Sequence, residues 1–208
     1  MKELDFASLL CSRLCHDLIS PVGAISNGLE ILSDEDDEVM RGEVIKLLEL
    51  SARQTSNRLK FFRLAFGAGG GIGALIPIKD AKSDSEALFD GTSIKLVWKS
   101  DIGELDKNTI KLLLNLILIS SEALIRGGTL MVDINENIDK TIVEVSAKGE
   151  RIIFQDKIKA IVCKETEYPE IEPKTAPAYI VSMIAELLNT KVDYKNHNEN
   201  SFTLTARV

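Results

Sequence analysis

Apolar residues recur at steps of three and four over the first third of the chain, which is the spacing of a helix face that packs against another helix. The first stripe consists of Leu14, Leu18, Val22, Ile25, Leu29 and Leu32. The second stripe consists of Val44, Leu48, Thr55, Leu59, Phe62 and Phe66. An acidic run at residues 33–38 lies between them and supplies carboxylates to cap the second helix. The pattern predicts two antiparallel helices over residues 4–66, joined by a short loop.

A lone helical hairpin exposes half of its apolar stripe to water, and a second hairpin that completes a four-helix bundle is the usual way to cover it. The rest of this chain offers no second hairpin pattern. We therefore predict a homodimer in which two copies of the hairpin form the bundle.

A glycine-rich segment at residues 67–73 follows the second helix. A phosphate-binding loop is one interpretation, but the segment lacks the Gly-Lys-Ser/Thr ending of such loops and does not follow a strand. A helix C-cap followed by a linker is the interpretation that we adopt. The predicted domains are a helical hairpin at residues 1–67, a linker at residues 68–79 and a second domain at residues 80–208.

Helical and alternating patterns mix beyond the linker. Helices are expected over residues 83–90, 107–126 and 176–188, and strands over residues 93–98, 129–135, 141–147, 191–194 and 202–208. Residues 148–173 are rich in Glu and Pro and are expected to be irregular. The second domain is therefore predicted to be one sheet backed by helices, which makes the whole chain α+β.

Composition narrows the classes of function. The 208 residues carry 25 basic and 32 acidic side chains, a net charge of −7, with no basic tract, so nucleic-acid binding is not expected. No stretch resembles a signal peptide or a membrane span. The three cysteines, Cys11, Cys15 and Cys163, form no Cys-x-x-Cys pair, which favours a reducing compartment. We expect a cytoplasmic protein that does not interact with membranes.

His16 is the strongest candidate for chemistry, because the other of the two histidines, His197, lies in a polar stretch expected to be a turn. At about 100° per residue, His16 lies about 200° around the helix from both Leu14 and Leu18, so its ring should face solvent. The neighbouring carboxylate of Asp17 can accept one ring N–H and leave the other nitrogen as a nucleophile. An exposed His-Asp pair without function also fits these two residues.

Pro21 lies inside the same helix, one turn beyond His16. It has no N–H to offer the carbonyl of residue 17, so we expect a kink at this place. Cys11 and Cys15, close to His16, raise the alternative of a metal site. We expect no metal, because the two cysteines share a helical face that His16 does not, and no fourth ligand is suitably spaced nearby.

The run His-Asp-Leu-Ile-Ser-Pro at residues 16–21 resembles the phosphoacceptor box in the dimerisation and histidine-phosphotransfer domain of bacterial histidine kinases. Ile19 stands where a basic residue is customary, and Ser20 stands where Thr or Asn is. The longer run at residues 15–30 is similar to that of the ChpT-type histidine phosphotransferases, which are dimeric phosphorelay proteins of kinase-like architecture that do not use ATP. The resemblance covers essentially the whole chain, because the hairpin, the glycine-rich junction and the α+β domain follow in the family's order.

The resemblance implies an antiparallel helical hairpin that forms a dimeric four-helix bundle, followed by a histidine-kinase ATPase-like α/β sandwich that has lost ATP binding. Asn115 resembles the first Asn of the kinase helical motif, but Ile119 stands at the magnesium-binding position. In the Asp-x-Gly-x-Gly box, Ala147 replaces the adenine-reading Asp and Arg151 the second Gly, while Gly149 is retained. No cofactor is expected, and the magnesium ion of the reaction is expected to come from the partner receiver domain.

The implied function is the relay of a phosphoryl group between the aspartates of receiver domains through His16, with Asp17 positioning the ring. The implied donor is the receiver domain of a CckA-like hybrid histidine kinase, and the implied acceptors are CtrA-like and CpdR-like response regulators. On the first helix we expect receivers to contact Ser12, Arg13, Ile19, Ser20, Gly23 and Asn27. Antiparallel counting adds Arg53, Asn57 and Lys60 of the second helix.

Two other functions stay open at this point. One is an ATP-dependent sensor histidine kinase core, which Ile119, Ala147 and Arg151 argue against. The other is a catalytically inert dimeric adaptor that binds receivers without carrying phosphate.

Overall fold

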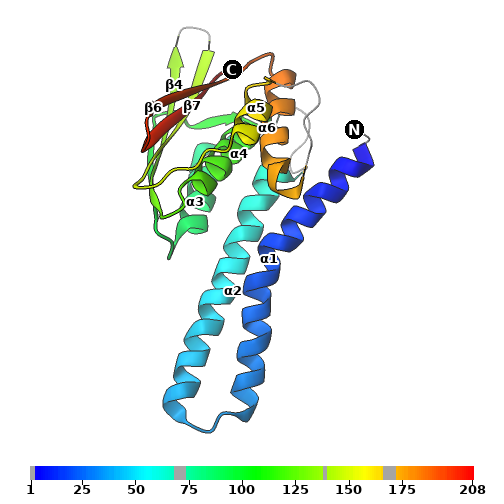
Figure 1. Ribbon diagram of the computed structural model, residues 1–208, viewed down its shortest axis with the longest axis vertical. Coiled ribbons are helices and arrows are strands. Elements are labelled where there is room, and N and C mark those ends of the chain that lie inside the picture. Colours follow the sequence, from blue (N-terminus) through cyan, green and yellow to red (C-terminus); the bar gives the residue numbers. More distant parts are fainter. Residues whose placement is uncertain (1–2, 68–73, 138–139, 166–171) are drawn as a thin grey trace.

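Two long helices form the N-terminal part of the computed structural model, which describes residues 3–67, 74–137, 140–165 and 172–208. Helix α1 spans Glu3–Asp34 and helix α2 spans Glu38–Phe66, and they run antiparallel side by side (Figure 1). The acidic run between them caps α2, because Asp37 accepts hydrogen bonds of 2.9 Å from the backbone N–H groups of Val39 and Met40. The predicted helical hairpin is confirmed.

The two helices pack closely where a glycine faces larger side chains. A Cβ atom on Gly28 of α1 would lie 2.8 Å from Leu48 Cδ2 and 3.7 Å from Val44 Cγ1 of α2. Val44 and Leu48 both belong to the apolar stripe predicted for α2. This part of the stripe therefore holds the hairpin together, and the absence of a side chain at position 28 sets how near the helices come.

The second part of the chain is a sheet of five strands in the order β2-β4-β5-β7-β6. The strands are β2 (Ile94–Ser100), β4 (Gly128–Asn137), β5 (Lys140–Lys148), β6 (Val192–Asn198) and β7 (Ser201–Arg207). Strand β2 pairs parallel to β4, and the other neighbours are antiparallel. Along β4, Leu130, Val132 and Ile134 are buried while the residues between them are partly exposed, so one face of the sheet carries the core.

Helices cover that face of the sheet. They are α3 (Ile78–Phe89), α4 (Lys107–Ala123), α5 (Asp156–Val162) and α6 (Ala176–Leu187), with a short 3-10 turn, η1, at Pro173–Thr175. Helix α4 packs against β4, β5, α6 and the C-terminal half of α2, so it lies between the sheet and the hairpin (Figure 1). The result is the predicted α/β sandwich joined to a helical hairpin.

The hairpin and the sandwich share one hydrophobic core. Phe61, Phe62 and Ala65 of α2 are buried in the same cluster as the fully buried residues of α4 and the sheet. Asn115 of α4 is also fully buried, and its Nδ2 donates to the carbonyl oxygen of Ala65 at 3.1 Å. The two parts of the chain are therefore bound by apolar packing and by a buried hydrogen bond.

Several predicted elements need correction. Helix α3 begins at Ile78 and not at residue 83, and Leu75–Pro77 forms a three-residue strand, β1, paired with β3 at Glu104–Asp106. Both strands are too short to give an alternating pattern, and each is followed directly by a helix. Residues 68–73 of the predicted linker lie outside the described residues, and β1 and the start of α3 occupy the end of the predicted 68–79 range.

Further corrections concern the C-terminal part. Residues 148–173 were expected to be irregular, yet α5 lies among them, because Ile158, Ile161 and Val162 supply a short buried face. Helix α4 ends at Ala123 rather than at 126, before a turn in which Gly127 adopts a φ of +78° against Ser93. His197 lies in strand β6 and not in a turn. Within the described residues, no helix is long and apolar enough to cross a membrane.

Candidate functional site

The ring of His16 lies on the exposed side of α1, where the helical spacing places it. Its side chain is 82% exposed, and its Nδ1 lies 3.1 Å from Oδ1 of Asp17. A carboxylate can only accept hydrogen bonds, so this contact places the ring proton on Nδ1 and leaves Nε2 with a free lone pair. In the neutral form of the ring, Nε2 is thus the nitrogen that is free to act as a nucleophile.

Asp17 is held from its other side. Its Oδ2 accepts a hydrogen bond of 2.7 Å from Nε of Arg13, one turn earlier on α1. The Arg13 side chain is only 11% exposed, and its Nη2 pairs with Oε1 of Glu122 on α4. A continuous chain of hydrogen bonds therefore begins at the exposed ring of His16, passes through Asp17 and Arg13, and ends at Glu122 in the second domain.

Burial and neighbouring charges have opposite effects on the pKa values of Arg13 and Glu122 in this chain of hydrogen bonds. Burial works against the charge on Arg13, but the carboxylates of Glu122 and Asp17 outweigh that effect and raise the pKa of its guanidinium. Burial also raises the pKa of the Glu122 carboxyl, and the attraction of Arg13 offsets only part of that rise. A partly buried carboxylate that is costly to ionise thus depends on Arg13 for its charge.

The backbone under His16 is supported from α2. Pro21 lies inside α1 and has no N–H for the carbonyl of Asp17. Nη1 of Arg58 donates to that carbonyl oxygen at 2.5 Å. The lost helical hydrogen bond predicted from the sequence is replaced by one from the partner helix of the hairpin.

A cleft of about 620 Å³ opens beside the ring. Helix α1, helix α4 and the segment around η1 line it with Ser12, Arg13, His16, Asp17, Glu122, Glu172, Pro173 and Lys174. Lys174 is exposed. The pKa of the Glu172 carboxyl is lowered mainly by Lys157 and to a smaller extent by the charge of Lys174. The cleft is thus a surface composed of both domains.

The sequence reasoning missed Glu122, Lys174 and Arg58, which belong to segments far from His16 in the chain. One signal could have found Glu122: it is the only acidic residue of α4, a helix whose other residues are mostly buried and apolar. No comparable signal marks Lys174 or Arg58. Charged residues on exposed helix ends and faces are common, so their type alone is uninformative.

The α1 residues at which receiver contact was predicted are accessible, with one exception. Ser12, Ser20 and Asn27 are exposed, Ile19 is 71% exposed, and a Cβ atom on Gly23 would meet nothing within 4 Å. Arg13 is buried instead, because its guanidinium pairs with Glu122 of α4 where the segment around η1 packs against α1. It lines the inside of the cleft rather than its outer surface.

The three residues predicted on α2 lie apart from the ring. Nδ2 of Asn57 donates to the carbonyl of Ala87 in α3 at 2.9 Å, and Nε of Arg53 lies 4.0 Å from Oδ2 of Asp90. Lys60 is exposed. None of the three is among the described residues that line the cleft, because their side of α2 is turned toward α3.

The positions that resemble the kinase nucleotide motifs belong to the core. Ile119 and Ala147 are 3% and 0% exposed, in the cluster that fills the sandwich. Nδ2 of Asn115 is engaged with the carbonyls of Ala65 and Lys111. Arg151 is exposed. Within the described residues, no three His, Cys, Asp or Glu side chains lie together as a metal site would require.

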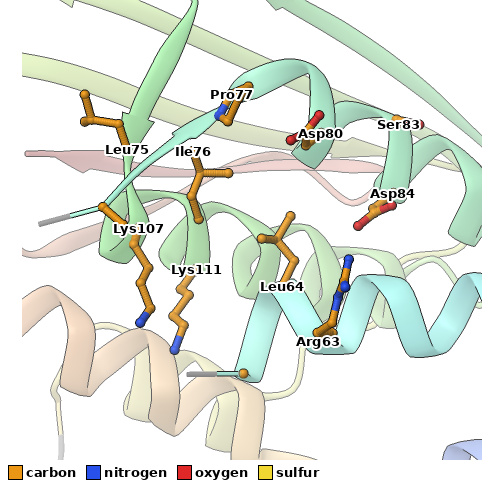
Figure 2. A pocket seen from close by; sticks show the side chains of 12 residues that line it. Arg63, Leu64, Leu75, Ile76, Pro77, Asp80, Ser83, Asp84, Lys107 and Lys111 are labelled. Carbon is orange, nitrogen blue, oxygen red and sulfur yellow. The ribbon is translucent and has the colours of Figure 1, made fainter. Parts of the chain in front are cut away.

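A second cleft, of about 430 Å³, lies where α2 ends against β1, α3 and α4. Figure 2 shows Arg63 reaching toward Asp84, while Lys107 and Lys111 lie at the opposite end. Burial lowers the pKa of Lys111 and raises the pKa of Asp84. This cleft has mixed charge and shares no lining residue with the one beside His16.

An α/β sandwich fused to a helical hairpin with an exposed histidine is the architecture of histidine-kinase-type proteins. The catalytic domain of the histidine kinase ThkA superposes with a TM-score of 0.51 at 15% identity, over 66% of this chain and 95% of that one, which shows the fold. Closer similarity extends over the whole chain. A solved bacterial phosphotransferase at 32% identity superposes with a TM-score of 0.87, covering 99% of this chain and 97% of that one.

Sequence comparison gives the family. Residues 78–200 match the model of the histidine phosphotransferase C-terminal domain. The protein phosphotransferase ChpT of Brucella abortus (strain 2308) is 35% identical over 194 residues, which are 92% of this chain and 90% of that protein. The chain therefore belongs to the family of ChpT-type histidine phosphotransferases.

Proposed function

We propose that this protein relays a phosphoryl group between receiver-domain aspartates through His16, without using ATP. The observation that carries the proposal is the exposed ring of His16, whose Nδ1 is held by Asp17 so that Nε2 faces solvent in a cleft. Such a nitrogen is an available nucleophile for an incoming acyl phosphate.

The proposed step needs no proton transfer. The lone pair of Nε2 attacks the phosphorus of a phosphoaspartate, the new P–N bond forms, and the bond from phosphorus to the aspartate oxygen breaks as the carboxylate leaves. The ring then carries a positive charge with its proton still on Nδ1, next to the carboxylate of Asp17. Attack by the aspartate of a second receiver reverses these bond changes and frees the ring. The receivers supply the magnesium ion that stabilises the transferring group.

Independence from ATP is supported by the second domain. Where kinases of this fold hold magnesium and adenine, Ile119 and Ala147 are buried apolar residues. The amide of Asn115 is hydrogen-bonded to backbone carbonyls and leaves no donor for a nucleotide. The domain acts in this proposal as a wall of the cleft and not as a nucleotide carrier.

The partners follow from the family. We propose the receiver of a CckA-like hybrid kinase as donor, CtrA-like and CpdR-like regulators as acceptors, and the cytoplasm as the compartment in which they meet. Receivers would dock over Ser12, Ile19, Ser20, Gly23 and Asn27 of α1, a surface of mostly small or polar side chains beside the ring.

A homodimer is proposed from the uncovered apolar face of the hairpin. Gly28 and Val44 face each other across the hairpin, and one residue further on, Leu29 and Ile45 turn to the same side of the antiparallel pair. They are 56% and 44% exposed, and Val22 and Leu59, whole numbers of heptads away on α1 and α2, are both 49% exposed. A second copy of the hairpin would cover this stripe.

Phosphoryl transfer from a radiolabelled receiver tests the proposal. Label should move to the wild-type protein and not to His16→Ala, while His197→Ala, which removes the only other histidine, should accept label normally. Equal labelling of wild type and His16→Ala would refute the role of His16. Receiver binding without any labelling of the wild type would favour the inert adaptor, and self-phosphorylation with Mg-ATP would favour the kinase core.

Docking over α1 has a separate test. Gly23→Arg should weaken receiver binding, because a long side chain would stand beside the ring where nothing now lies within 4 Å of the Cβ position. Gly42→Arg is the matched control, since that glycine of α2 also has open space and lies near the far end of the hairpin. Equal binding by both variants would rule out this surface of α1.

A further inference from the structure

We propose that Glu122 of α4 is a positioning residue for phosphoryl transfer, acting through Arg13 and Asp17 on the ring of His16. This inference rests on the proposed role of His16 as the phosphoryl carrier. It assigns to the second domain a part in the chemistry of the hairpin.

The geometry supports an action that passes from group to group. Both carboxylate oxygens of Asp17 are engaged, Oδ1 with His16 Nδ1 at 3.1 Å and Oδ2 with Arg13 Nε at 2.7 Å. The guanidinium of Arg13 is a rigid planar fork, so fixing one of its nitrogens fixes the direction of the others. Glu122 holds Nη2 of that fork. The position of Glu122 therefore sets the plane of the Arg13 group, and through it the orientation of the Asp17 carboxylate.

Burial makes this arrangement rigid. The side chains of Arg13, Asp17 and Glu122 are 11%, 16% and 27% exposed, whereas His16 is 82% exposed. Water can replace few of the hydrogen bonds among the three charged groups, so each depends on its neighbours. Without Glu122, one edge of the Arg13 fork loses its partner, and Asp17 rests on a guanidinium that is free to turn.

The fold itself gives little reason for an acid at this position. Leu118, Ile119 and Ala123, on the neighbouring turn of α4, are buried in the hydrophobic core. A partly buried ion pair is often no more stabilising than apolar residues of similar size. Glu122 is also the only acidic residue of α4, and it lines the cleft that contains the ring. A role at the site accounts for its position.

The test uses the full-length protein and a phosphorylated receiver. In single-turnover measurements, Glu122→Gln should slow transfer to His16 by between about 10- and 100-fold, the scale of a misplaced reacting group. Receiver affinity should stay within about two-fold, because the lost interaction orients the ring and does not bind the partner. The ¹⁵N chemical shifts of the His16 ring should move toward a mixture of tautomers, a change that a purely structural role would not produce.

Matched variants complete the test. Arg13→Gln should slow transfer about as much as Glu122→Gln, and the double variant should be no slower, because both act through one chain of contacts. Glu122→Asp, which keeps the carboxylate, should recover part of the rate and keeps the test open should the amide variant not fold. Glu186→Gln, which breaks an exposed 2.9 Å pair with Lys164 on the second domain, should transfer at the wild-type rate.

The results separate this inference from the function on which it rests. Labelling of His16→Ala at the wild-type rate overturns the proposed function itself. Normal labelling that depends on His16, with unchanged rate and unchanged ring shifts in Glu122→Gln, overturns only the role of Glu122. Additive rate losses in the double variant would also contradict it.

Discussion

Nη1 of Arg58 lies 2.5 Å from the backbone carbonyl oxygen of Asp17, so the second helix of the hairpin donates to the turn that carries His16. In an uninterrupted helix that carbonyl would accept from residue 21, but Pro21 has no N–H. Helix α1 remains continuous from Glu3 to Asp34 and changes direction partway along its length (Figure 1). A hydrogen bond within α1 is thus replaced by one between α1 and α2, close to the ring of His16.

This exchange predicts a coupling between the two positions. Arg58→Met should destabilise the protein by about 1–3 kcal/mol, because the Asp17 carbonyl is left without a donor. In the Pro21→Ala background the substituted residue has its own N–H, so the same Arg58 change should cost clearly less. Urea unfolding of the four proteins measures the coupling. Equal losses in both backgrounds would mean that Arg58 does not replace the missing helical bond.

A second prediction concerns the buried amide of Asn115. Its Nδ2 donates to the carbonyls of Ala65 and Lys111, and its Oδ1 has no hydrogen-bond partner among the residues that the structure describes. Asn115→Ala should lower the free energy of unfolding by about 1–3 kcal/mol, because the buried carbonyl of Ala65 near the end of α2 loses this donor. Asn108→Ala, near the start of the same helix, should cost less, since that side chain is only half-buried. Thermal unfolding compares them, and equal losses would contradict the argument.

The apolar face proposed for dimerisation can be tested with two neighbouring residues. Ile45→Glu should convert a dimer of 22.9 kDa chains into monomers, because it places a charge in the predicted centre of the bundle. Leu47→Glu should leave the dimer intact, since Leu47 is similarly exposed, at 46% against 44%, but points to the opposite side of the hairpin. Light scattering after size exclusion gives the masses. Dissociation caused by Leu47→Glu alone would place the interface on the other face.

The thiol of Cys163 should react slowly. Burial and the nearby Glu165 raise its pKa. The thiolate is the reactive form, so a raised pKa lowers the reactive fraction at any pH below it. In a Cys11→Ser/Cys15→Ser variant, Cys163 is the only thiol, and its alkylation at pH 8 should be slower in the folded protein than in urea. The folded-state rate should also rise at higher pH than the unfolded-state rate. Coincident pH profiles would show that the folded environment does not disfavour the thiolate.

Periodicity was sufficient to predict the hairpin and the exposure of His16, because both follow from the angle between successive residues of one helix. It could not supply the pairing of Arg13 with Glu122, or of Arg58 with Asp17, since these contacts join segments distant in the chain. Arg13 shows the limit clearly. Its place on the helix suggested an exposed residue, but the segment around η1 packs against α1 there and Glu122 of α4 pairs with the guanidinium.

The shortest elements could not be predicted from the sequence, for a related reason. Strands β1 and β3 each span three residues, so neither contains enough positions to show a period. Helix α5 has only seven residues, and its buried face consists of three side chains. The longer helices and strands, whose patterns extend over several turns or pleats, were found, although α3 begins before residue 83 and β6 extends beyond residue 194.

The core shared by α2 and α4 limits the ways in which a phosphoryl group can reach His16. A kinase must carry bound ATP to its histidine, which requires a catalytic domain that swings about the hairpin. Here Phe61, Phe62 and Ala65 of the hairpin are buried with the core of the sandwich, and a swing would expose them to water. Under the proposed relay, the phosphoryl group therefore reaches and leaves His16 through the docking and release of receivers, and not through the motion of a domain within the protein.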